Sequence, residues 1–151
     1  MSPEVRVLRA GDETVLQSVA AGVFDHDVQP RLAAEFLRDP RHHLAVALDH
    51  GQVVGFASGV QYVHPDKPSE LFINEVGVAP SHQGRGLGRA ILRALLAHAT
   101  SLGCREAWVL TDRTNRAARR LYESAGGQEA PRDQVMYSFA LLDGRRDAAH
   151  G

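Results

Sequence analysis

The chain has 151 residues, a formal net charge of −1 and 44% hydrophobic residues. This length suits a single domain, and the hydrophobic content argues against an intrinsically disordered chain. The near-zero charge lacks the basic excess typical of nucleic-acid-binding proteins, and no apolar run approaches the roughly 20 residues that cross a bilayer. We therefore expect neither nucleic acid nor a membrane as a partner.

Cysteine and histidine usage gives further expectations. Cys104 is the only cysteine, so no internal disulfide can form, and the N-terminus lacks the apolar core of a secretion signal. A cytoplasmic location is the default expectation. The histidines, His82 among them, lack metal-ligand spacing with cysteines or carboxylates, so they are assigned to surface and packing and no metal is expected. His26, between two aspartates, is the exception, because it could touch substrate. Residues 1–143 are expected to form one domain, and 144–151 a flexible tail.

Hydrophobic periodicity predicts the elements of the first half of the chain. In chain order they are a strand at 4–9, a helix after Gly11-Asp12, a short helix at 30–37, and strands at 44–48 and 53–63. The last two strands flank Asp49-His50-Gly51, a sequence typical of a hairpin turn.

The second half predicts a strand-helix-strand unit followed by a helix and a closing strand. The expected elements are a strand at 71–78, a helix from Gly86 to Gly103, a strand at 106–111, a helix at 115–124 and a final strand at 134–142. Antiparallel strands followed by a strand-helix-strand unit predict the α/β class, with a mixed sheet and helices on both faces.

A glycine-rich turn joins the strand at 71–78 to the following helix. Gly84, Gly86 and Gly88 remove side chains where the backbone turns, so several N–H groups can point at one anion beside the positive end of a helix. The pattern indicates a diphosphate-binding loop. It is not the nucleotide hydrolase loop, because Arg89 and Ala90 follow Gly88 in place of Lys and Ser or Thr.

Three arginines reinforce this interpretation. Arg85, Arg89 and Arg93 are spaced four residues apart and so lie on one stripe of the helix that follows the glycines. Such a stripe is either a solvated helix face or a set of phosphate contacts.

The pattern Gln83-x-x-Gly86-x-Gly88, after Val-x-Val-x-Pro, resembles the acetyl-CoA signature of the GNAT N-acetyltransferase superfamily. A second segment, Asn115-x-x-Ala118-x-x-Leu121-Tyr122-x-x-x-Gly126, is similar to a later motif of that superfamily. The resemblance implies a mixed, mostly antiparallel central sheet of six to seven strands that splays between strands 4 and 5. It also implies acetyl-CoA as cosubstrate. Gly127 departs from the family pattern, which often has an aromatic residue there.

The resemblance also implies which residues hold the cofactor: the strand would pair with the pantetheine arm, the loop would bind the diphosphate, and the later motif would flank the thioester. The set is Val76, Gly77, Val78, Gln83, Gly84, Arg85, Gly86, Leu87, Gly88, Arg89, Asn115, Ala118 and Tyr122. For Asn115, helix capping is the alternative role, and both roles can hold at once.

An amine must lose a proton before it attacks a thioester, so a base is required. Glu75 and Asp112 are the candidates, since a carboxylate buried in an apolar sheet has a raised pKa and is a better base. A buried ion pair with an arginine is the alternative for Glu75. Tyr122 matches the position whose hydroxyl approaches the cofactor sulfur, so it is expected to protonate the leaving thiolate, with packing as the alternative. Cys104 is not expected to act as a nucleophile, which favours direct transfer in a ternary complex.

The segment Ser69-Glu70-Leu-Phe-Ile-Asn-Glu75-Val-Gly-Val78, with Asp112 ten residues before Tyr122, is similar to an acidic-aromatic-acidic strand of bacterial aminoglycoside 3-N-acetyltransferases. Within the superfamily, the chain resembles those enzymes from residue 53 through 122. An acidic cleft suits a polycationic antibiotic, and the resemblance implies a role in antibiotic resistance. The expected substrate-binding residues are Asp25, Asp27, Glu70, Glu75 and Asp112. Ordinary surface acidity is the alternative interpretation of these carboxylates.

Other functions stay open beside the aminoglycoside hypothesis. One is acetylation of another small amine, a polyamine, a lysine or a protein N-terminus, and the other is a non-catalytic acyl-CoA-binding module. A homodimer is common in the family and is therefore a possible assembly.

Overall fold

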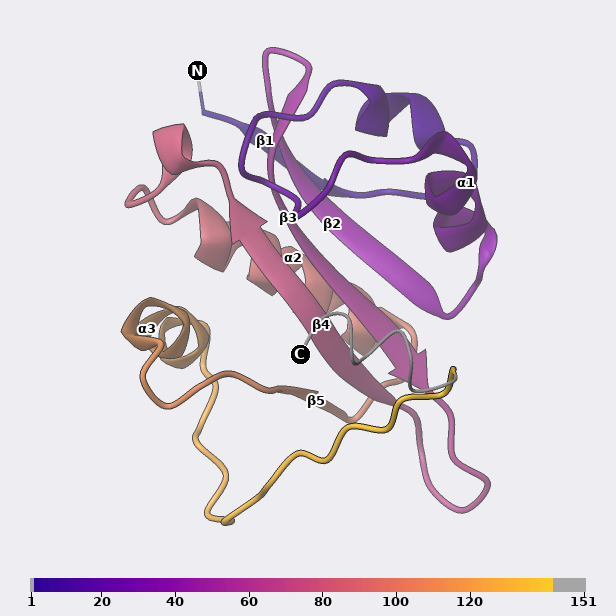
Figure 1. The fold of residues 1–151 in the computed structure, drawn as a ribbon, viewed down its shortest axis with the longest axis vertical. Coiled ribbons are helices and arrows are strands. Elements are labelled where there is room, and N and C mark those ends of the chain that lie inside the picture. Colours follow the sequence, from indigo (N-terminus) through magenta and orange to yellow (C-terminus); the bar gives the residue numbers. More distant parts are fainter. Residues whose placement is uncertain (1, 143–151) are drawn as a thin grey trace.

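The computed structural model describes residues 2–142 and contains one five-stranded mixed sheet, with strand order β1-β2-β3-β4-β5 (Figure 1). The strands are β1 (Glu4–Val7), β2 (His42–Asp49), β3 (Gln52–Tyr62), β4 (Glu70–Val78) and β5 (Glu106–Val109). The helices are α1 (Pro30–Arg38), α2 (Leu87–Ser101) and α3 (Arg116–Ser124), with short 3-10 helices at Glu13–Gln17 and Pro80–His82. The tail expected at 144–151 lies outside the described residues.

Strands β1 to β4 form an antiparallel meander, and β5 adds to β4 in parallel through the α2 crossover. The hairpin between β2 and β3 has the two-residue turn His50-Gly51, whose φ angles are 52° and 77°. Two successive positive φ angles match the twist of the flanking strands, which confirms the hairpin predicted at this position.

Helix α2 covers one face of the sheet, and α1 lies over the other (Figure 1). The inner side of α2 places Ile91 and Leu95 against the sheet, and both are fully buried, as are Val46, Val53 and Leu71 of the strands. Each such side chain contributes about 2 kcal/mol by leaving water. No helix within residues 2–142 combines the length and apolar content needed to cross a membrane.

The helix predicted after Gly11-Asp12 is replaced by a single 3-10 turn, and residues 18–29 form a loop. Backbone bonds explain the early stop: the Val53 N–H donates to the Ser18 carbonyl at 2.9 Å, and the Ala20 N–H donates to the Val53 carbonyl at 2.8 Å. These bonds pair Val19 with β3, and that pairing is incompatible with a continuing helix.

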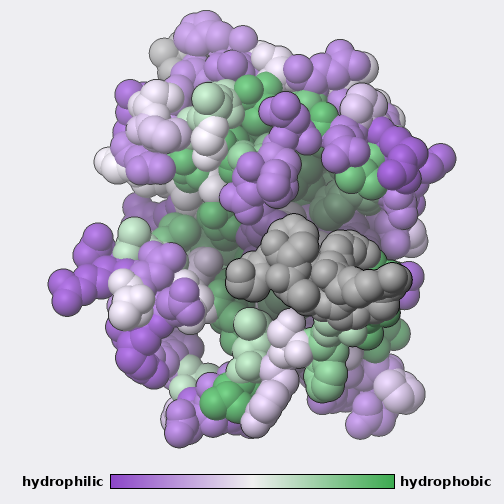
Figure 2. Space-filling view, in the orientation of Figure 1, coloured by the Kyte–Doolittle hydropathy of each residue, from purple (hydrophilic) through white to green (hydrophobic). Residues whose placement is uncertain are grey.

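The predicted strand at 134–142 was wrong for this structure, so the described residues hold five strands where six to seven were expected. Its alternating apolar side chains have no partner strand and stand in solvent, with Tyr137 79% and Phe139 82% exposed. Figure 2 shows green apolar side chains at the foot of the same face, where Figure 1 places β5 and the segment after α3.

Candidate active site

The site begins where β4 and β5 part. Their pairing ends at Ile73 and Val109, so the backbone of residues 74–78 has β3 on one side and no strand from residues 2–142 on the other. The register between β3 and β4 shifts here, because Ser58 lies opposite Glu75 while Gly59 lies opposite Ile73. The extra residue, Asn74, is a β-bulge, a feature that redirects side chains near sheet edges and active sites. The second half of β4 therefore offers backbone groups to an extended ligand.

The glycine-rich loop follows this open edge. Gly84 and Gly86 both have φ of 77°, and a Cβ on either would meet no atom within 4 Å, so the loop presents bare backbone. Gly86 caps α2, and the first N–H groups of a helix have no partner within that helix. The Gln83 side-chain amide donates to the Val78 carbonyl at 3.0 Å, which ties the loop to the end of β4. This arrangement suits an anionic group such as a diphosphate.

The arginines of the stripe are all exposed, and two of them bond to backbone. Arg85 donates to the Ser81 carbonyl at 3.2 Å, and Arg93 donates to the Ser124 carbonyl at 3.4 Å. Leu87 has its side chain in the core, so only its backbone can meet a ligand.

Helix α3 forms the opposite wall of the opening. The side-chain Oδ1 of Asn115 accepts from the Ala118 N–H at 3.1 Å, which caps the helix. A Cβ on Gly88 would lie 3.4 Å from Leu121, so α3 packs closely against the start of α2. Tyr122 is half-buried against the core, and burial raises the pKa of its hydroxyl. The group is therefore protonated at neutral pH and able to donate a proton.

The two candidate bases lie on different strands. Glu75 is exposed on β4, not buried as expected, because no strand covers this part of its edge. No arginine or lysine forms a salt bridge with Glu75 in the part of the chain that the structure describes. Asp112 is exposed after β5, and its carbonyl accepts from the Asn115 N–H at 2.9 Å, which links it to the cap of α3.

The loop at 18–29 lies against the end of β4. A Cβ on Gly77 would sit 2.6 Å from the Val23 carbonyl oxygen, and the Phe24 ring stacks on Phe56 with centroids 4.1 Å apart. Phe56 in turn pairs with Gly77 across β3 and β4. The acidic residues Asp25 and Asp27 follow directly and are thereby held close to the open strand.

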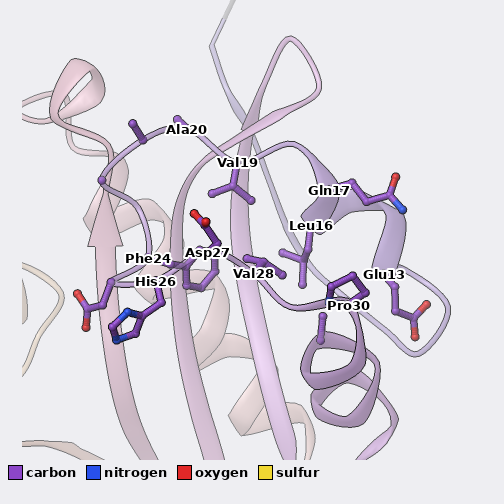
Figure 3. A pocket seen from close by; sticks show the side chains of 14 residues that line it. Glu13, Leu16, Gln17, Val19, Ala20, Phe24, His26, Asp27, Val28 and Pro30 are labelled. Carbon is purple, nitrogen blue, oxygen red and sulfur yellow. The ribbon is translucent and has the colours of Figure 1, made fainter.

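A pocket of about 500 Å³ lies between this loop, the first 3-10 helix and α1 (Figure 3). Its lining residues include the acidic Glu13, Asp25 and Asp27, and none of them is lysine or arginine. Val28 and Leu16 provide apolar walls. The pocket size falls within the range of small-molecule sites, and its charge favours a cation.

Glu70 stands apart from this group. It begins β4, five residues before Glu75, where its carboxylate lies 2.8 Å from His64 Nε2 and 3.8 Å from Lys67 Nζ. A strand rises about 3.3 Å per residue, so Glu70 and Glu75 are about 16 Å apart along β4.

Sequence reasoning assigned His82 to surface and packing, whereas the structure bonds it to Asp49. His82 Nε2 lies 2.7 Å from Asp49 Oδ2, at the base of the glycine-rich loop. The two residues are 33 positions apart, and no spacing rule relates them.

Comparison with known proteins identifies the family. The model of the acetyltransferase (GNAT) family matches residues 13–127. The chain is 36% identical over 115 residues to the N-alpha-acetyltransferase RimI of Mycobacterium tuberculosis, which covers 74% of this chain and 70% of that protein. It is 37% identical over 143 residues to the mycothiol acetyltransferase of Thermomonospora curvata, covering 88% of this chain and 46% of the relative. The chain thus spans about half the length of that relative.

A solved aminoglycoside acetyltransferase from an uncultured soil metagenomic sample shares the fold, with a TM-score of 0.75 and 20% identity. That similarity covers 95% of this chain and all of the other. The chain belongs to the GNAT family and is an acetyl-CoA-dependent N-acetyltransferase.

Proposed function

We propose that the enzyme acetylates a primary amine of a small polycation, with an aminoglycoside antibiotic as the leading substrate and resistance as the consequence. The observation that carries this proposal is the 500 Å³ pocket lined by Glu13, Asp25 and Asp27 without a lysine or arginine. Three carboxylates around one pocket attract and orient a molecule that bears several ammonium groups. The presence of aminoglycoside acetyltransferases among proteins of this fold is consistent with it.

The proposed binding of acetyl-CoA uses the open edge of β4, the glycine-rich loop and α3. Backbone N–H groups from Gln83 through Arg89, with the Arg85 and Arg89 side chains, would hold the diphosphate of acetyl-CoA. The open edge from Val76 to Val78 would pair with the pantetheine arm, and Asn115 and Ala118 would flank that arm from α3. Once bound, the cosubstrate supplies an acyl group activated as a thioester.

Proton transfer then depends on the chain's own side chains. Glu75 or Asp112 would accept the proton of the substrate ammonium, directly or through water, and both carboxylates are accessible to solvent. A backbone N–H at the end of β4 would stabilise negative charge on the acyl oxygen, an effect worth about 3 kcal/mol in related acyl transfers. Tyr122 would donate its proton to the leaving sulfur, because burial keeps the hydroxyl protonated.

The transfer is proposed to be direct, without an acetylated enzyme. Cys104 follows α2 at the end remote from the glycine-rich loop, about 25 Å away along the helix axis. Burial also raises the pKa of the Cys104 thiol, which disfavours the nucleophilic thiolate.

The proposed regiochemistry is the 3-amino group, and it rests on the resemblance of the β4 sequence. Glu70 would contact a distal ring of an extended substrate, because it lies at the opposite end of β4 from the acidic pocket. Such a contact would have to compete with the His64–Glu70 pair.

A protein N-terminal amine is the second candidate substrate. The 36% identity to an N-alpha-acetyltransferase favours it, since that similarity covers most of both chains. A peptide substrate would enter as an extended strand and would not need a pocket for several ammonium groups.

Release of free CoA thiol tests the proposal. Purified enzyme with acetyl-CoA is presented with aminoglycosides that have or lack a 3-amino group, with polyamines, and with peptides that begin with alanine. We expect turnover with aminoglycosides and loss of turnover when the 3-amino group is missing. Turnover confined to peptides would contradict the aminoglycoside proposal and identify a protein N-terminus as the substrate. Binding of the coenzyme without turnover on any amine would favour a non-catalytic binding module.

A further inference from the structure

A carboxylate-imidazole pair holds the base of the glycine-rich loop. Asp49 ends β2, and His82 ends the 3-10 helix at Pro80–His82. Their side chains are 24% and 15% exposed, and His82 Nε2 lies 2.7 Å from Asp49 Oδ2. The other imidazole nitrogen, Nδ1, lies 2.8 Å from Ser81 Oγ. Both ring nitrogens of His82 are therefore engaged, which fixes the orientation of the ring.

The contact between Asp49 and His82 is a strong one. The hydrogen bond from His82 holds the pKa of the Asp49 carboxyl below its usual value, and the nearby His50 lowers that pKa further. Hydrogen bonds to a charged acceptor are shorter and stronger than those between neutral groups.

The loop beyond His82 has few other attachments. Gly84 and Gly86 contribute no side chain, and Gln83 bonds to the neighbouring Val78 carbonyl. Arg85 bonds to the Ser81 carbonyl within the same segment. The side chains of Ser81, Gln83 and Arg85 bond within residues 78–85, whereas the His82 side chain bonds to Asp49, beside the turn between β2 and β3.

We infer that Asp49 and His82 are positioning residues for acetyl-CoA. By fixing the loop to the hairpin of β2 and β3, the pair keeps the N–H groups of residues 84–88 oriented for the diphosphate before it binds. Preorganisation of this kind raises affinity because the ordering cost is not incurred on binding. Neither side chain needs to touch the coenzyme. This inference rests on the proposed cofactor site.

His50 supplies a matched control. Its Nδ1 lies 2.8 Å from the other carboxylate oxygen of Asp49, yet its ring is 89% exposed and belongs to the hairpin turn, not to the loop. A role confined to stabilising the hairpin would give His50 and His82 similar importance. A role in the loop would involve His82 alone.

Calorimetric titration with CoA separates these roles. We expect Asp49→Ala and His82→Asn each to raise the dissociation constant for CoA about tenfold, which corresponds to about 1.4 kcal/mol of weaker binding. His82→Gln, whose amide reaches the place of Nε2, should stay within about threefold of wild type. His50→Asn, which tolerates the positive φ, should bind as wild type does. The double variant Asp49→Ala/His82→Asn should be no weaker than either single variant.

Steady-state kinetics give a second measurement. The KM for acetyl-CoA should rise in His82→Asn while kcat at saturating acetyl-CoA is retained, since no reacting group has changed. Unchanged CoA affinity in folded Asp49→Ala and His82→Asn, or an equal loss in His50→Asn, would overturn the inference. Wild-type protein that binds no CoA would instead overturn the proposed cofactor site, and the inference with it.

Discussion

Tyr122, whose hydroxyl has a pKa raised by burial, is the proposed proton donor to the leaving sulfur. Replacing Tyr122 by Phe keeps the half-buried ring and removes the proton, so coenzyme affinity should stay within about twofold. Turnover should fall about 100-fold, the lower end of the range for general acid catalysis. Single-turnover rates and CoA titration measure the two effects. Turnover equal to wild type would leave Tyr122 as a packing residue.

A buried histidine, His43, makes stability depend on pH. His43 lies beneath α2 with its Nδ1 3.1 Å from His98 Nε2, and only 8% of the residue is exposed. Burial lowers the pKa of His43 from 6.5, and the neighbouring imidazoles of His98 and His42 lower it further. Between this lowered pKa and 6.5 the unfolded chain binds more protons than the folded one, so stability rises with pH across that window and is lost as pH falls.

The variant His43→Asn tests this dependence, because Asn keeps a hydrogen-bonding group near the Nδ1 position without titrating. Urea unfolding midpoints between pH 5 and pH 7 should vary less in His43→Asn than in wild type. His26→Asn, on the exposed loop, should keep the wild-type slope. An identical slope in wild type and His43→Asn would contradict the assignment.

At the scale of elements, Gly77 joins β4 to the acidic loop. An added Cβ would lie 2.6 Å from the Val23 carbonyl oxygen and 2.9 Å from the Phe56 ring, so the backbone at 18–29 must move. Gly77→Ala should therefore cost about 1 to 3 kcal/mol of unfolding free energy and lower kcat/KM for the amine substrate.

Gly88→Ala is the matched comparison for stability. Its Cβ would meet Leu121 at 3.4 Å, an ordinary contact, and alanine is the better helix former by about 0.5 to 1 kcal/mol. Denaturant unfolding of both variants gives the comparison. Equal destabilisation by the two substitutions would show that the approach of Val23 to Gly77 is not the cause.

The extended segment after α3 makes a different prediction. Tyr137 and Phe139 are exposed in this structure, so the double substitution Tyr137→Ser/Phe139→Ser should change the unfolding free energy by less than about 0.5 kcal/mol. A loss above about 2 kcal/mol in thermal or urea unfolding would mean that these side chains bury apolar surface in solution.

Elements whose signals are local were predictable from the sequence. The hairpin turn at His50-Gly51 and the apolar stripe of α2 depend on neighbours within a few residues, and both were found as expected. The helix predicted after Gly11-Asp12 failed because Val53, far along the chain, pairs with residues 18–20. The segment at 134–142 alternates apolar and polar residues as a strand does, but in the described structure it pairs with no other strand. The sequence of one segment cannot specify whether a partner strand is available.

The candidate site divides in the same way. The glycine-rich loop and the Asn115 cap follow from short motifs, and the structure ties the loop to the end of β4 through Gln83 and caps α3 with Asn115. The Asp49–His82 pair joins segments 33 residues apart and has no sequence signature. Exposure of Glu75 depends on where β5 leaves β4, a property of the assembled sheet that the sequence of β4 does not contain.

For the whole molecule, the net charge of −1 conceals an uneven distribution. Carboxylates line the pocket beside the loop at 18–29, whereas Arg85, Arg89 and Arg93 lie along the start of α2. In the proposed function, the pocket carboxylates would attract the amine and the arginines would attract the diphosphate. Such steering acts through solvent, and it weakens as the Debye length falls from about 10 Å at 0.1 M salt to about 3 Å at 1 M.

Salt dependence consequently distinguishes steering from short-range contact. We expect kcat/KM for a polycationic aminoglycoside to fall about tenfold between 50 mM and 500 mM salt, while kcat changes less than about twofold. In Asp25→Asn/Asp27→Asn the value at low salt should already be lower, and its salt dependence should flatten. A peptide whose only positive charge is its N-terminal ammonium provides the comparison substrate. Its kcat/KM should depend less on salt, because a single charge is attracted less strongly by the same field. Equal salt slopes for the variant and wild type would mean that the pocket carboxylates do not guide the substrate.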